Sequence, residues 1–75
     1  MVLPEFLVLF RDGCWHIECG NQMFGSYETL VGATAVAIKV ARFNLVNLPT
    51  RVRVEGIDGK YETVWNPEEP DVYQF

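Results

Sequence analysis

The sequence predicts a two-layer α+β domain, in which one helix packs on one face of a mostly antiparallel five-stranded sheet in the order βββαββ. Two observations predict this fold. Residues Tyr27 to Leu45 repeat apolar side chains with a helical period, whereas both flanks are short apolar runs separated by glycine-containing turns. In addition, small residues line one face of the helix and large rings line one side of the strands, so the two layers complement each other.

The helix is bounded by recognisable capping residues. Thr29 is the expected N-cap, because its hydroxyl can accept a hydrogen bond from a free first-turn N–H, and Ser26 is the other candidate. Asn44 and Asn47 can adopt left-handed cap conformations, and Pro49 prevents the helix from continuing. These signals predict a helix that ends before residue 49.

The two faces of this helix differ in side-chain size. Ala33 and Val40 lie at the centre of the face expected to meet the sheet, with Gly32, Ala37 and Ala41 beside them. The opposite face is unusually apolar for a solvated helix, and it carries Val31, Thr34, Ala35, Ile38 and Leu45. It is either a surface for a partner or a mildly apolar exposed face.

Two turns define a three-stranded meander before the helix. A two-residue turn at Asp12-Gly13 pairs Phe10 with Trp15, and a second turn at Gly20-Asn21 pairs Ile17 with Phe24. The turns are located independently, yet both predict the same apolar side. Its members are Phe6, Val8, Phe10, Trp15, Ile17, Cys19 and Phe24.

A second Asp-Gly pair, Asp58-Gly59, predicts a hairpin after the helix. A two-residue loop there would pair Val52 with Trp65, Val54 with Thr63, Gly56 with Tyr61, Arg53 with Val64, Glu55 with Glu62 and Ile57 with Lys60. The large rings Tyr61 and Trp65 would then face the helix. The crossover should bring the fourth strand beside the first, in the order 3-2-1-4-5.

Composition and charge describe one folded domain. A chain of 75 residues with 49% hydrophobic and 13% aromatic residues forms a single domain, which we place at residues 1–65, with a tail at 66–75. Val72, Tyr73 or Phe75 could anchor that tail. No apolar run is long enough to span a bilayer, and residues 1–10 do not form a signal peptide. We therefore expect a cytoplasmic protein with free cysteines.

The sequence resembles a family of small bacterial proteins of unknown function, common in rhizobia and other proteobacteria. The residues that carry the resemblance are F-L-V-L-F-R-D-G-x-W-x-I at 6–17, F-G-x-Y-x-T at 24–29 and V-x-V-x-G-x-D-G-K-Y-x-T-x-W at 52–65. The segments 45–49 and 66–73 depart from the family pattern. The resemblance implies the same fold and a bacterial cytosolic setting, and it implies no activity.

Candidate chemistry is sparse. Cys14, His16 and Cys19 suggest a metal site, but strand alternation directs the first two to one face and Cys19 to the other, and a structural zinc needs four ligands. Cys14, His16 and Glu18 could form a catalytic row, although an open sheet face has no pocket. Glu55 opposite Glu62 is expected to be part of a solvated charge ladder. We therefore expect no metal, no cofactor and no enzyme activity.

Surfaces are the remaining candidates for function. The leading hypothesis is a non-enzymatic protein-interaction or self-association module, binding a protein partner or forming a homodimer. Its candidate surfaces are the open sheet face, with Leu7, Leu9, His16 and Met23, and the outer helix stripe, with Val31 and Ile38. The alternative is nucleic-acid binding through a local basic strip at Arg51, Arg53 and Lys60. The net charge of −4 disfavours that alternative.

Overall fold

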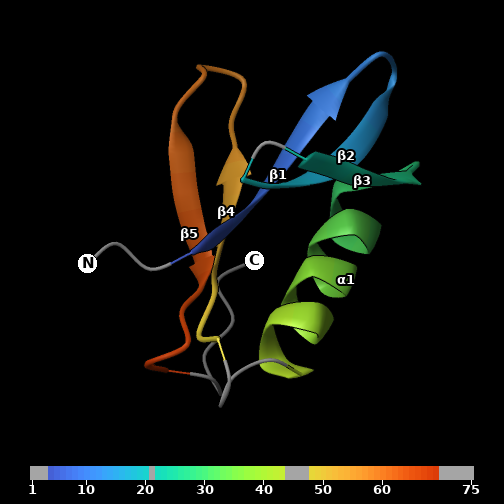
Figure 1. Ribbon diagram of the computed structural model, residues 1–75. Helices are drawn as coiled ribbons and strands as arrows, with labels where there is room; N and C mark the ends of the chain where they lie inside the picture. The colour runs from blue at the N-terminus through green and yellow to red at the C-terminus, as the bar shows by residue number, and fades with distance from the viewer. Residues whose placement is uncertain (1–3, 21, 44–47, 70–75) are drawn as a thin grey trace.

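The computed structural model describes residues 4–20, 22–43 and 48–69. It contains five strands and one helix, namely β1 (Glu5–Arg11), β2 (Cys14–Cys19), β3 (Gln22–Tyr27), α1 (Leu30–Phe43), β4 (Arg51–Glu55) and β5 (Tyr61–Trp65). The strands form one sheet in the order β3-β2-β1-β4-β5, and α1 covers one of its faces (Figure 1). The predicted fold class and strand order are both confirmed.

The helix begins where the sequence indicated. The Thr29 hydroxyl accepts a hydrogen bond from the backbone N–H of Gly32 at 3.0 Å, which is the geometry of an N-cap. The predicted caps Asn44 and Asn47 lie outside the described residues, as do the tail residues Val72, Tyr73 and Phe75.

The first hairpin has the predicted register. Asp12 and Gly13 both have positive φ values, 54° and 83°, as a two-residue type I′ turn requires. This turn pairs Phe10 with Trp15 and Leu9 with His16. β2 and β3 also pair as predicted, with Ile17 opposite Phe24, up to an irregularity at Gly25.

β4 pairs with β1 in parallel, as the predicted strand order requires. It places Phe6 beside Val52 and Val8 beside Val54 on the face that meets α1. These residues contribute to the core beside Ile17. The helix therefore packs over the centre of the sheet.

The second hairpin differs from the prediction by one residue. Its loop has three residues, Ile57 to Gly59, and is closed by a hydrogen bond of 2.8 Å from the N–H of Gly56 to the carbonyl oxygen of Lys60. Glu55 consequently pairs with Tyr61 rather than with Glu62. Since a shift of one residue moves every side chain to the other face, Tyr61 lies on the open face and not against the helix.

A bulge at the end of β5 restores the predicted pairing of Val52 with Trp65. Val52 faces Trp65 and Arg53 faces Thr63, so Val64 is an extra residue on β5. Both Val64, at 6% exposure, and Trp65, at 1%, are therefore buried in the core. Trp15 packs against the same core, so the two tryptophans share the helix side of the sheet.

Candidate functional site

The predicted patch on the open sheet face is only partly available. Met23 is exposed at 46%, but Leu9 is 2% exposed, so the expectation that Leu9 contributes to a free surface is wrong. Leu7 is partly buried. His16 covers part of this face, because its ring nitrogens lie 2.7 Å from the carbonyl oxygen of Gly25 and 3.2 Å from that of Arg11. Polar contacts, and not a continuous apolar patch, organise this side of the sheet.

A charged cluster joins the two hairpins across this face. Arg11 donates to both carboxylate oxygens of Glu55, at 2.6 and 3.1 Å, and the Tyr61 hydroxyl donates to the same carboxylate at 3.3 Å. The hydrogen bond from Arg11 is the main cause of a lowered pKa for Glu55. Burial and the neighbouring carboxylate raise the pKa of Tyr61. The cluster ties the ends of β1 and β4 together beyond their last paired residues.

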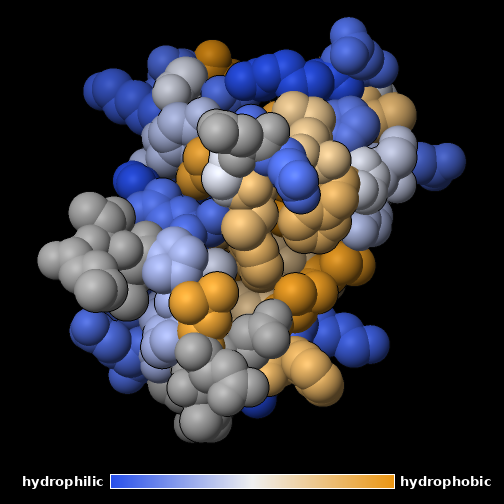
Figure 2. All heavy atoms as spheres, in the orientation of Figure 1, coloured by the Kyte–Doolittle hydropathy of each residue, from blue (hydrophilic) through white to orange (hydrophobic). Residues whose placement is uncertain are grey.

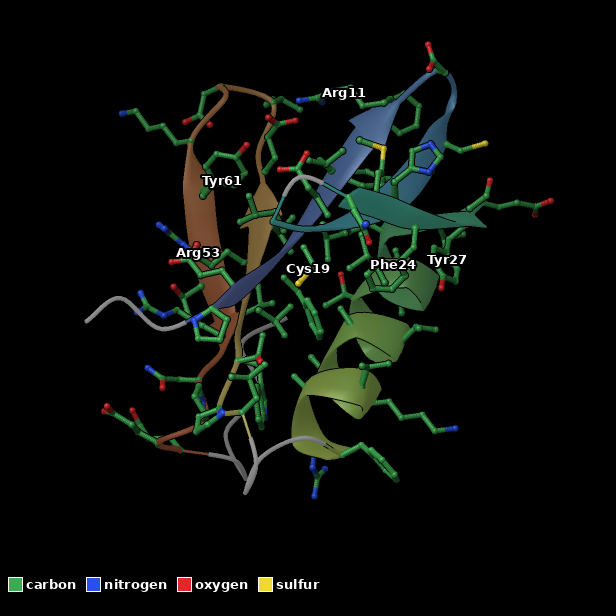
Figure 3. All side chains as sticks on the ribbon, viewed as in Figure 1. Arg11, Cys19, Phe24, Tyr27, Arg53 and Tyr61 are labelled. Carbon is green, nitrogen blue, oxygen red and sulfur yellow. The ribbon has the colours of Figure 1, made fainter. Side chains whose placement is uncertain are left out.

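Two members of the predicted basic strip contact other groups of the protein. Arg51 and Arg53 both approach the carboxylate of Glu5, at 3.9 and 3.7 Å. Arg53 also lies over the ring of Tyr61, 5.9 Å from its centroid, and donates to the Tyr61 carbonyl oxygen at 3.3 Å (Figure 3). Two of the three cations expected to meet phosphates are therefore engaged with groups of the protein itself.

The outer helix stripe also differs from the prediction. Ile38 is 4% exposed and Thr34 1%, so both belong to the inner face of α1 together with the alanines at 33, 37 and 41. The helix is rotated so that its buried centre includes these two branched residues. Ile38 is therefore not a surface residue, whereas Val31 remains exposed at 63%.

The reactive residues are arranged as the strand period predicted. Cys14 and His16 lie on the open face, and Cys19 packs against the core on the helix side. Across residues 4–20, 22–43 and 48–69, no group of histidine, cysteine and carboxylate side chains could hold a metal ion. Glu55 and Glu62 lie on opposite faces, so the predicted carboxylate pair is wrong.

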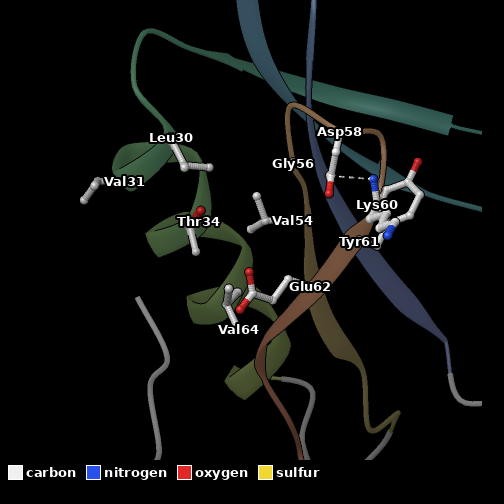
Figure 4. Close-up of a pocket in the computed structure, with 10 residues that line it drawn as sticks. All are labelled: Leu30, Val31, Thr34, Val54, Gly56, Asp58, Lys60, Tyr61, Glu62 and Val64. Carbon is white, nitrogen blue, oxygen red and sulfur yellow. Dashed lines mark hydrogen bonds between the residues drawn. The ribbon is translucent and has the colours of Figure 1, made fainter.

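A partly enclosed groove lies between α1 and β5 in the described part of the chain. The helix packs against the first four strands, and β5 lies beyond them at the edge of the sheet. The resulting hollow has a volume of about 500 Å³. We call it the α1–β5 groove; its apolar wall consists of Leu30, Val31, Val54 and Val64, and its polar rim consists of Asp58, Lys60 and Glu62 (Figure 4).

Two polar groups of this groove have no hydrogen-bond or ion-pair partner among the described residues. The Thr34 hydroxyl oxygen is buried in the groove wall and has no hydrogen-bond partner among the described residues. The Glu62 side chain extends from β5 toward α1. Within the described ranges, neither a hydrogen bond nor an ion pair engages its carboxylate. The groove thus combines an apolar wall with a carboxylate that has no direct partner among the described residues.

Sequence reasoning missed this groove because it assigned a two-residue loop. The two-residue register predicts that Glu62 and Val64 face away from the helix, whereas the three-residue loop turns them toward it. One signal was available: in three-residue hairpin loops, the third position adopts a left-handed conformation and prefers glycine. Gly59 fits this position with a φ of 80°.

Other apolar side chains are exposed outside the groove. Figure 2 shows hydrophobic residues gathered over β3 and the neighbouring face of α1, with hydrophilic residues along the margins. Phe24 and Phe10 are 39% and 48% exposed, although both were expected in the core. Their rings pack edge-on against Phe6 and Trp15, at 6.0 and 5.2 Å between centroids. These contacts extend the core toward the edge and the tip of the sheet.

No protein-family model matches the chain, and neither the curated proteins nor the solved structures include one with significant similarity to it. The resemblance to a family of small bacterial proteins stays a prediction. Among the described residues, no helix has the length and hydropathy needed to cross a bilayer.

Proposed function

We propose that this protein is a non-enzymatic protein-interaction module, and that its α1–β5 groove receives an apolar partner segment carrying a basic side chain. The observation that supports the proposal is the combination of an exposed apolar wall with the unpaired Glu62 carboxylate in one hollow. A cytoplasmic location remains part of the proposal.

The apolar wall supplies the driving force. Val31 and Leu30 are 63% and 38% exposed, and they line the groove together with the partly buried Val54. Covering apolar surface stabilises a complex by roughly 25 cal/mol per Å², so a few branched side chains at a groove wall favour an apolar partner. A concave apolar surface with a polar rim is typical of a binding site.

The carboxylate determines which apolar partner fits. A partner without a positive charge would remove water from Glu62 and offer nothing in return, which is unfavourable. A lysine or arginine placed against Glu62 replaces that water with an ion pair. The net charge of −4 also attracts cationic partners over longer distances.

The alternative of nucleic-acid binding is weaker. The Glu5 carboxylate lies against Arg51 and Arg53, so phosphates would have to compete with an existing negative charge. The ring of Tyr61, which could stack on a base, already lies against the guanidinium group of Arg53. Modules that bind single-stranded nucleic acids use an extended strip of free cations and stacking rings. These residues do not form such a strip.

Selection from a random peptide display library tests the proposal. We expect the selected peptides to place lysine or arginine between apolar residues. Val31→Lys should abolish their binding, and Glu62→Lys should reverse the charge preference. Phe43→Lys is the matched control, because Phe43 is 88% exposed on the same helix but outside the groove, and it should retain binding. Selected peptides whose binding Val31→Lys leaves unchanged would contradict the proposed site.

A further inference from the structure

β5 offers an unpaired strand edge next to the groove. It is the last strand of the sheet and pairs only with β4, so its outer side carries backbone groups without a strand partner among the described residues (Figure 1). β3 forms the opposite edge, but Gly25, with a φ of 75°, interrupts it at its middle. The bulge at Val64 lies near the end of β5 and leaves Tyr61 to Thr63 regular. Regular edges of this kind accept another strand.

The hairpin closure determines which backbone groups point outward. Gly56 and Lys60 form a hydrogen-bonded pair at the loop. Because antiparallel pairs alternate between hydrogen-bonded and non-hydrogen-bonded, Glu55–Tyr61 is a non-hydrogen-bonded pair. Tyr61 and, by the same alternation, Thr63 therefore direct their N–H and C=O groups away from β4. The Tyr61 carbonyl also accepts from Arg53, and its second lone pair can still accept from an added strand.

The side chains beside this edge are self-complementary in charge. Lys60 and Glu62 are two positions apart and both line the groove, so they lie on the same side of β5. Neither charged group has an ion-pair partner among the described residues. Two antiparallel copies of β5 with the two-fold axis at Tyr61 place each Lys60 opposite Glu62 of the other copy. An axis at Glu62 would instead set two carboxylates directly opposite each other. An axis at Thr63 would leave Lys60 of one copy too far along the strand to pair with Glu62 of the other.

We infer that two copies of this chain pair antiparallel through their β5 edges, with Tyr61 opposite Tyr61 of the partner subunit at the two-fold axis. This inference goes beyond the proposed function, because the second copy binds the edge of β5 and not the apolar wall of the groove, and the two share only the ion pair of Glu62 with a basic side chain of the partner. The pairing forms one continuous ten-stranded sheet with both helices on the same face. Each copy contributes the same surface, as a closed two-fold interface requires.

Disulfide cross-linking tests the register directly. Single cysteines replace Tyr61, Glu62 or Thr63 in a background in which Cys14→Ser and Cys19→Ala remove the native thiols. Directly paired residues in an antiparallel sheet have Cα atoms about 4.5–5.5 Å apart, which a disulfide can join. Under mild oxidation Tyr61→Cys should form a covalent dimer, and Thr63→Cys should remain monomeric. Cross-links at position 62 or 63 without one at 61 would overturn the register.

Charge exchange tests the same pairing without added cysteines. By sedimentation equilibrium, Lys60→Glu or Glu62→Lys should each weaken the dimer about tenfold, because each substitution creates two like-charge pairs, and the double exchange should restore it. Lys39→Glu and Glu68→Lys are the controls, since they make the same charge changes at exposed sites away from the edge. A wild-type chain that stays monomeric up to about 1 mM would overturn the inference. Peptide binding to that monomer would leave the proposed function standing.

Discussion

The two Asp-Gly hairpins carry the same dipeptide and form different loops. In the first, Asp12 itself adopts a positive φ of 54°, so Asp12 and Gly13 make up the whole loop. In the second, Gly59 alone has a positive φ, the Asp58 carboxylate accepts the N–H of Lys60 at 3.0 Å, and the loop also includes Ile57. An Asp-Gly pair therefore predicts a hairpin, but it does not fix the loop length.

The consequences of the extra residue reach the surface that we propose as functional. In the first hairpin, the predicted faces and the observed faces agree. In the second, Tyr61 moves to the open face and Glu62 to the helix side, which forms the rim of the α1–β5 groove. The bulge at Val64 limits this effect to part of β5, so the core keeps Trp65.

The largest loss of stability is expected in the core, at the residue that the bulge of the second hairpin keeps buried. Trp65→Ala should reduce the free energy of unfolding by about 3–5 kcal/mol, because Trp65 is 1% exposed and its removal leaves a cavity. Urea denaturation measures the change. Phe43→Ala, at a residue that is 88% exposed, should alter stability by less than about 0.5 kcal/mol. A Trp65→Ala loss below about 1 kcal/mol would show that the bulge does not place this ring in the core.

The turn residues should respond differently to the same substitution. Asp12→Val should cost about 2 kcal/mol, since a β-branched residue is strained at a φ of 54°. Asp58→Val should cost only about 1 kcal/mol, because it loses one hydrogen bond to a backbone N–H without left-handed strain. Thermal or urea unfolding of the two variants measures the difference. Equal losses would indicate that the two aspartates have the same backbone conformation.

Much of this fold was predictable from the sequence, and the limit lies in the second hairpin. The apolar alternation around Ile17 and the Asp12-Gly13 turn agree with each other, so the first three strands could be assigned from pattern alone. Around β5 the pattern is ambiguous, because Val64 and Trp65 are adjacent large apolar residues, and both can be buried only if a bulge is present. The register therefore required three-dimensional packing information.

The candidate site was less predictable than the fold. Wheel geometry placed Ile38 on the outer stripe, because the alanines suggested the centre of the buried face, yet packing against the sheet buries Thr34 and Ile38 as well. Leu9 was expected to be exposed on the open face, but it is 2% exposed. The cluster of Arg11, Glu55 and Tyr61 on that face was not predicted. Contacts between residues 44 positions apart cannot be read from periodicity.

Deleting Ile57 should convert the second hairpin into the form of the first. The shortened loop would be Asp58-Gly59, still closed by Gly56 and Lys60, so the register of β4 and β5 would not change. Because Ile57 is fully exposed, the loss of stability should stay below about 1 kcal/mol. Urea denaturation measures the stability, and amide chemical shifts of β5 report the register. Deletion of Asp12 is the contrasting case, since it removes half of a two-residue turn and should cost more.

The smallest effect concerns the cluster that joins the two hairpins. Arg11 lowers the pKa of Glu55 in the folded protein, so this group stabilises the fold above its unfolded pKa of about 4.5, and the contribution is lost as the pH falls through the lower folded pKa. Glu55→Gln should therefore flatten the dependence of stability on pH in this acidic range. Arg11→Met should flatten it similarly, and the double variant should add nothing further. Unfolding curves measured from pH 7 downward provide the comparison, and an unchanged slope in both variants would argue against the contact.

The one-residue shift of β5 is the central claim, because it turns Lys60 and Glu62 toward the helix side, where they form the groove rim beside the strand edge. Cross-strand nuclear Overhauser effects between Hα protons test it most directly, since these protons approach each other in non-hydrogen-bonded antiparallel pairs. We expect strong Hα–Hα effects for Glu55 with Tyr61 and for Arg53 with Thr63. An effect between Val54 and Thr63 in their place would restore the two-residue loop and contradict the account.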